Sequence, residues 1–157
     1  MIILDSFSSD QVGFIFSDVI VDVISTTCGI STEVFNVDEG FQFNELIGLM
    51  NLTGKNHGII FISADENSIR TLAAYMTGVS NNEITKDDIY DTLSEIVNMT
   101  AGNAKLRFNR SEDMFTLTSP FVISGKDMSA VMKKRINSVS RLISNSEISL
   151  LLTVVFY

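Results

Sequence analysis

Hydrophobic positions near the start of the chain recur with helical spacing. Apolar side chains stand at Phe16, Ile20, Val23 and Ile24, which places them on one face of an amphipathic helix. Gly29 follows this pattern, and glycine is the residue at which helices most often stop. The spacing predicts a helix over residues 9–28.

Apolar and β-branched runs come next and predict strands. Residues 32–37 and 41–52 have this character, and so does the run Gly-Ile-Ile-Phe-Ile-Ser over residues 58–63. Between the last two runs, residues 54–57 read Gly-Lys-Asn-His, which is typical of a turn. The sequence therefore predicts a strand meander, with His57 as a solvated turn residue.

Helical spacing returns twice in the middle of the chain. A short helix is expected from about Asp65 to Gly78, with its apolar face formed by Ile69, Leu72, Ala73 and Met76. A longer helix follows, because Thr85 and Asp88 form a capping-box pattern. We expect this helix to run through residue 101 and to stop at Gly102.

The chain resembles itself across these segments. Six positions of the first helix match six of the third at one constant offset: Phe16, Ile20, Val23, Ile24, Thr27 and Gly29 match Ile89, Leu93, Ile96, Val97, Thr100 and Gly102. Each helix precedes a strand-like segment, 31–36 and 104–109. We infer a degenerate internal repeat, about 10–63 and 85–157, inside one domain spanning 1–157.

The repeat also interprets two difficult stretches of the second half. Residues 133–143 have helical spacing but precede a turn and a β-rich run, as 41–52 do, so we predict a strand there. Residues 120–129 then form an insertion that the first half lacks. The apolar run 150–156 is either a central strand or one that pairs with a second copy.

Composition narrows the class of protein. The 157 residues are 45% hydrophobic, enough for one compact core. Eleven basic against nineteen acidic residues give a net charge of -8, which disfavours nucleic acids and anionic membranes as partners. The N-terminus lacks the pattern of a signal peptide, and residues 150–157 are too few to span a membrane. A soluble cytoplasmic protein is expected.

Few residues offer metal or nucleophile chemistry. Cys28 and His57 are the single cysteine and the single histidine, so an internal disulfide and a zinc ligand set are excluded. The acids Asp87, Asp91 and Glu95 on one straight helix would converge poorly on an ion. We expect no metal site, and the remaining chemistry uses carboxylates, amides and hydroxyls.

One polar line on the third helix stands out. At about 100° per residue, Asp91, Glu95, Asn98 and Gly102 fall within roughly 60° of one another, opposite the apolar face. One interpretation is a solvated face with acids near the positive end of the helix dipole. The mixture of side chains in this line favours a second interpretation, a surface that a partner approaches. A carboxylate and a carboxamide stand three residues apart, and the glycine that follows them removes bulk and leaves room for the partner.

The same line carries a family resemblance. The pattern Asp91-x3-Glu95-x2-Asn98-x3-Gly102, followed by the single proline, Pro120, in the segment 119–125, resembles the CheC/CheX/FliY family of chemotaxis phosphatases. One intact Glu-x-x-Asn motif is similar to the CheX branch. The resemblance implies an α+β fold: a pseudo-twofold α/β sandwich with a mainly antiparallel sheet and two long helices.

The resemblance also implies a function. The chain would hydrolyse the aspartyl phosphate of a CheY-type response regulator, with Asn98 orienting the attacking water and Glu95 docking to the regulator's active site. Asp91, Gly102 and Pro120 would contact this partner. The protein would need no cofactor of its own, since the regulator supplies magnesium, and it would form a homodimer.

Two alternatives stay open at this point. The chain could be a non-catalytic module that binds a response regulator, as flagellar-switch components do, although pure docking does not require Asn98. The first helix could carry a second site, since Asp18, Asp22, Ser25 and Gly29 repeat the line. Aspartate replaces glutamate there and serine replaces asparagine, so we expect a decayed copy with a structural role.

Overall fold

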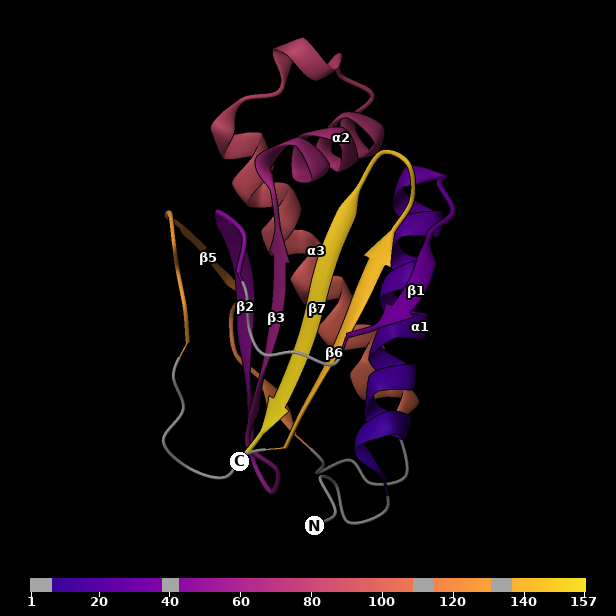
Figure 1. Ribbon diagram of the computed structural model, residues 1–157, viewed down its shortest axis with the longest axis vertical. Helices are drawn as coiled ribbons and strands as arrows, with labels where there is room; N and C mark the ends of the chain where they lie inside the picture. Colours follow the sequence, from indigo (N-terminus) through magenta and orange to yellow (C-terminus); the bar gives the residue numbers. More distant parts are fainter. Residues whose placement is uncertain (1–6, 38–42, 109–114, 131–136) are drawn as a thin grey trace.

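A computed structural model describes the structure of residues 7–37, 43–108, 115–130 and 137–157 (Figure 1). The elements, in chain order, are α1 (Ser9–Cys28), β1 (Glu33–Asn36), β2 (Leu46–Thr53), β3 (Gly58–Ala64), α2 (Glu66–Thr77), the 3-10 helix η1 (Asn81–Glu83), α3 (Lys86–Arg107), β4 (Thr116–Leu117), β5 (Phe121–Ser124), β6 (Asn137–Ser144) and β7 (Ser149–Phe156).

The described strands form one sheet in the order β1-β6-β7-β3-β2, and β4 and β5 both pair with the outer edge of β2. Every pairing among them is antiparallel. The two halves of the sheet are arranged alike. In one half β1 pairs with the hairpin β6–β7, and in the other β5 pairs with the hairpin β2–β3. A pseudo-twofold axis therefore passes between β3 and β7, and the expected α+β fold with two related halves is confirmed.

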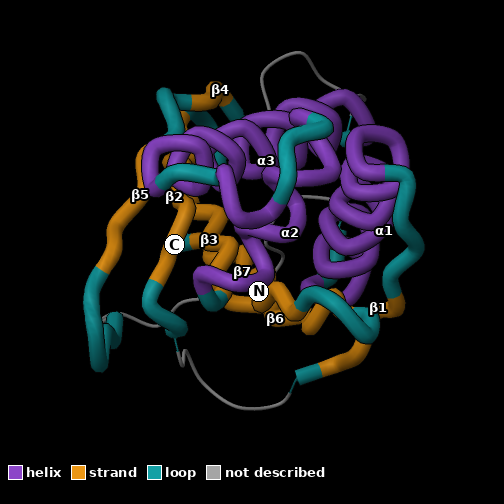
Figure 2. The backbone as a smooth tube through the Cα atoms, turned by 90° about the horizontal axis from the view of Figure 1, so that it is seen from above, coloured by secondary structure: helices purple, strands orange, loops and turns teal. Residues whose placement is uncertain are grey.

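The helices cover one face of the sheet (Figure 2). Side chains alternate along each strand, so Met50 of β2, Ile60 of β3 and Leu152 of β7 point toward the helices and are buried with the apolar faces of α1 and α3. The strand β7 lies between β6 and β3. It is thus a central strand of the monomer, and its edges are not available to a second copy.

A glycine on β2 lets α3 lie close to the sheet. A Cβ atom on Gly48 would stand 2.6 Å from Cγ2 of Val97 and 2.8 Å from Cγ of Leu93, closer than carbon atoms can approach. Only a residue without a side chain fits between this strand and the helix. The face of α3 that contains Leu93 and Val97 is fixed against the sheet as a result.

The ends of the helices follow the predicted signals in most places. The helix α1 ends at Gly29, whose φ of 70° is left-handed and suits glycine. The capping box of α3 is formed by Thr85 and Asp88. Hydrogen bonds from Thr85 lower the pKa of Asp88, so this cap stabilises the fold above the usual pKa of aspartate and is lost as the pH falls through the lowered value.

The prediction that Gly102 stops the third helix is wrong. The helix continues to Arg107, and Gly102 is not among the described glycines with positive φ. A glycine inside a helix costs only about 1 kcal/mol, and burial of Ala104 and Phe108 just beyond it outweighs that cost. The basic residues Lys105 and Arg107 also complement the helix dipole at this end.

The strand predicted over 104–109 is wrong for the same reason, since 104–107 belong to α3 and 109 lies outside the described residues. By topology β5 is the counterpart of β1, so the extra length of the second half precedes β5, at 108–120, and does not occupy 120–129. The strand predicted over 133–143 is confirmed as β6 from Asn137; 133–136 lie outside the described residues.

The remaining strand bounds differ by a few residues. The strand predicted over 41–52 begins at Leu46, with 41–42 outside the described residues, and the turn at 54–57 is confirmed. In the described part of the chain, α1 is the one helix that is long and apolar enough to cross a membrane, and half of its most apolar stretch is buried inside this fold.

The close approach at Gly48 generates a stability prediction. We expect Gly48→Ala to lower the free energy of unfolding by roughly 1–3 kcal/mol, because the added methyl group overlaps Leu93 and Val97. Gly102→Ala is the matched control: a Cβ there would meet nothing within 4 Å, so that variant should gain up to about 1 kcal/mol. Urea unfolding measures both, and equal stability of Gly48→Ala and wild type would contradict the packing of α3 on β2.

Candidate functional site on the outer face of α3

The polar line predicted from the sequence lies on the outside of the molecule. Asp91, Glu95 and Asn98 are exposed, while Leu93 and Ile96, on the opposite side of the same turns, are fully buried. The helix thus presents a carboxylate and a carboxamide, one turn apart, on its solvent face.

These polar groups have no structural partner in the part of the chain that the structure describes. Among the described residues, none donates a hydrogen bond to Asp91, Glu95 or Asn98 or forms an ion pair with them. Gly102 continues the line, half-buried, in open space where a Cβ atom would meet nothing within 4 Å. The described part of the fold therefore uses neither these side chains nor the glycine, and within it their hydrogen-bonding capacity is available to another molecule.

The chemistry that this pair can perform follows from its groups. The Asn98 carboxamide carries an acceptor oxygen and a donor NH2 in one rigid plane, so it can hold a water by one group and contact an anionic oxygen with the other. The Glu95 carboxylate can accept hydrogen bonds from a cation. Three residues of helix separate them by about 4.5 Å along the axis, so both can enter one cleft.

The last predicted contact residue, Pro120, lies on a different element. It is half-buried and immediately precedes β5, the strand beside β2 at the edge of the sheet. The helix α3 packs against β5 as well as β2. Pro120 therefore flanks the layer beneath α3 and does not continue the line Asp91, Glu95, Asn98 and Gly102.

The corresponding line on α1 is engaged inside the chain. The guanidinium of Arg107, in the last turn of α3, donates hydrogen bonds to the carboxylates of Asp18 and Asp22. These bonds raise the pKa of Arg107. Sequence reasoning missed Arg107, since its segment was expected to be a strand; only the correct helix length places it beside α1.

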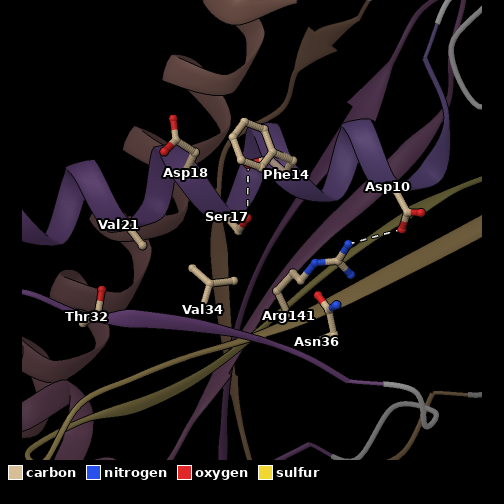
Figure 3. Close-up of a pocket in the computed structure, with 9 residues that line it drawn as sticks. All are labelled: Asp10, Phe14, Ser17, Asp18, Val21, Thr32, Val34, Asn36 and Arg141. Atoms are coloured by element: carbon tan, nitrogen blue, oxygen red, sulfur yellow. Dashed lines mark hydrogen bonds and ion pairs between the residues drawn. The ribbon is translucent and has the colours of Figure 1, made fainter.

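A hollow of about 520 Å³ lies beside α1, between that helix and the edge strand β1 (Figure 3). Phe14 and Val34 flank it with exposed apolar surface, and Arg141 reaches across it to Asp10. The hollow belongs to the half of the molecule that lacks the Glu-x-x-Asn pair. Its polar groups are partly used, because Arg141 is paired with Asp10 and Asp18 with Arg107.

The other reactive side chains stand apart from the outer face of α3. Cys28 is buried, and burial raises the pKa of its thiol, which disfavours the reactive thiolate. His57 is exposed beside the end of the chain, its ring stacked 6.4 Å from that of Tyr157. Among the described residues, no group of three or more histidine, cysteine or acidic side chains could hold a metal ion.

Comparisons with solved structures define the class of fold. A CheC-like superfamily protein from Shewanella sp. PV-4 superimposes with a TM-score of 0.80 at 20% identity, over 96% of this chain and 99% of that one. The chemotaxis protein CheX from Vibrio vulnificus gives 0.80 at 20% identity, over 94% and 99%. CheX in the CheX–CheY–BeF3–Mg2+ complex from Borrelia burgdorferi gives 0.75 at 19%, over 91% and 96%. The chain has the CheC-like α+β fold.

The family follows from the sequence itself. The model of the family described as chemotaxis phosphatase CheX matches residues 46–143, more than half of the chain and the part that contains Glu95 and Asn98. The protein belongs to the CheX family. A sequence comparison with curated proteins gives no match.

The contacts of Arg107 generate a prediction about the α1 line. We expect the double variant Asp22→Ala, Ser25→Ala to keep the full rate of any activity that depends on Glu95 and Asn98, because Asp22 is already paired with Arg107. Its stability should fall by no more than about 1 kcal/mol, since the pair is exposed. Phosphate-release rates and urea unfolding measure both quantities, and a loss of rate as large as that of Asn98→Ala would make α1 a working site.

Proposed function

We propose that this protein is a phosphatase that accelerates hydrolysis of the aspartyl phosphate on a CheY-type response regulator. The observation that supports the proposal is the free state of Glu95 and Asn98, two exposed hydrogen-bonding side chains on a fixed helix with no partner in the described chain. Membership of the CheX family and the structural similarity to CheX in a complex with CheY also favour this function.

In this proposal Asn98 positions the attacking water. Phosphoryl transfer needs a nucleophile held in line with the phosphorus, and a protein catalyses it almost entirely by positioning and electrostatic stabilisation. The amide oxygen accepts a hydrogen bond from the water, and the NH2 group contacts an oxygen of the phosphoryl group. Asparagine is a poor base, so the contribution of Asn98 is orientation.

Glu95 holds the partner in register. Its carboxylate, one helical turn from Asn98, can bind a cationic side chain in the regulator's active site by a charge-assisted hydrogen bond. Asp91 extends this acidic surface by one more turn. Gly102 on α3 and Pro120 before β5 are further contact positions for the partner. Docking and water positioning are thus assigned to different side chains of the same helix face.

The regulator supplies the rest of the machinery. Its own aspartyl phosphate, its magnesium ion and its cationic side chain are already assembled, so the phosphatase adds no cofactor. We place the protein in the cytoplasm with its substrate and propose that it acts as a homodimer, which light scattering at micromolar concentration tests.

The deciding experiment mixes a CheY-type regulator, a small phosphodonor and magnesium with a substoichiometric amount of this protein, and follows phosphate release. Asn98→Ala should lower the stimulated rate by on the order of 100-fold while binding changes little, because the amide orients water and anchors little. Glu95→Ala should weaken binding as well as turnover.

Asn103→Ala provides the matched control, since Asn103 is an exposed asparagine of the same helix outside the line. It should keep the wild-type rate. Near wild-type turnover by Asn98→Ala would eliminate the mechanism. Tight binding of the regulator with no multiple-turnover release by the wild-type chain would instead identify a docking module related to the flagellar switch.

A separate prediction concerns metal content. The purified protein should carry no stoichiometric transition metal, and its activity should depend on magnesium only through the regulator. Elemental analysis of the protein, with and without dialysis against a chelator, measures this directly. A bound transition metal at one equivalent, lost together with activity on dialysis, would contradict the proposal.

A further inference from the structure

The correct length of α3 places one more side chain on the candidate docking face. Leu106 lies four residues after Gly102 and, at about 100° per residue, within roughly 20° of Glu95 around the helix axis. Its side chain is 65% exposed. The line of Asp91, Glu95, Asn98 and Gly102 therefore ends in an exposed leucine.

Leu106 is exposed although the residues that follow it hold the end of α3 to the rest of the protein. The next residue, Arg107, is held to α1 through Asp18 and Asp22. Phe108, which caps the helix, is buried, with its ring 5.7 Å from that of Phe16 and 5.9 Å from that of Phe115. These contacts fix the direction of the last turn, so Leu106 is directed outward while its neighbours hold the helix to the core.

We propose that Leu106 is an apolar anchor for the response regulator, which contacts it with an apolar patch on the rim of its active-site cleft. The inference rests on the proposed function, because it takes the partner of Glu95 and Asn98 as the occupant. An isolated exposed leucine is ordinary on a protein surface. This one is continuous with polar groups that have no partner among the described residues and with Gly102, where a Cβ atom would meet nothing within 4 Å.

The distances suit a single interface. Eight residues of helix separate Asn98 from Leu106 by about 12 Å along the axis. A standard protein interface buries about 800 Å² on each partner, a disc with a radius of roughly 16 Å. An interface centred on Asn98 therefore includes Leu106 inside its edge.

Charge along α3 gives the partner one orientation. The first turns of the outer face carry Asp87, Asp88 and Asp91, whereas the end of the line beyond Asn98 offers Gly102 and Leu106. A regulator with cationic groups on one side of its cleft and apolar groups on the other fits this gradient in one direction only. Leu106 would thus contribute to affinity and to register, and it would leave the chemical step to Asn98.

The test compares Leu106→Gln with Phe14→Gln. Both wild-type side chains are large, apolar and about equally exposed, 65% and 68%, but Phe14 lies on α1. The probe is a CheY-type regulator with beryllium fluoride and magnesium, and calorimetry measures the Kd. Leu106→Gln should weaken binding by roughly 10-fold, as expected for an apolar side chain that is buried on binding, and Phe14→Gln should leave it unchanged.

Turnover separates an anchor from a group that acts on the chemistry. Leu106→Gln should raise the KM for the phosphorylated regulator by a similar factor and keep kcat. A wild-type protein that binds and hydrolyses, with an unchanged Kd and KM in Leu106→Gln, would overturn this inference alone. A wild-type protein that does not bind the regulator would overturn the proposed function and this inference together.

Discussion

The contact between Gly48 of β2 and the pair Leu93 and Val97 of α3 determines what the rest of the molecule can present. A helix has one set of side chains for each direction around its axis, so fixing one face inward fixes the opposite face outward. The absent side chain at Gly48 lets the helix approach the sheet at one rotation. Glu95 and Asn98 are exposed because their neighbours are locked into the core.

The two halves share a topology but differ in how they use it. In the first half, the glycine that allows helix and sheet to pack closely is on the helix. A Cβ atom on Gly13 of α1 would stand 2.5 Å from Val139 of β6. The carboxylates on the outer side of α1 are then engaged by Arg107. In the second half, Glu95 and Asn98 on the outer side of α3 have no partner among the described residues. An exposed ion pair contributes little stability, so what Arg107 mainly changes is the availability of Asp18 and Asp22 to another molecule.

Much of this arrangement was predictable from local patterns. The apolar spacing of α1, the caps at Thr85 and Gly29 and the polar line on α3 are each set by a few neighbouring residues, and all are found in the structure. The end of α3 was not predictable, because Gly102 has the chemistry of a helix stop. Distant contacts of Phe108 and Arg107 keep the chain helical past it. The position of Leu106 was not predicted either. Residues 104–109 were expected to form a strand, so Leu106 was not placed on the helix face that contains Glu95 and Asn98.

The rigidity of α3 bears directly on the kind of catalysis proposed. A side chain that only orients water lowers the barrier by restricting where the water can be, and a gain of about 100-fold corresponds to about 2.7 kcal/mol. That gain is lost if the helix rotates or its end frays. The capping box at one end and the Phe108 and Arg107 contacts at the other hold both ends of α3. A helix held in this way can carry a positioned amide into the cleft of a partner without support from any loop.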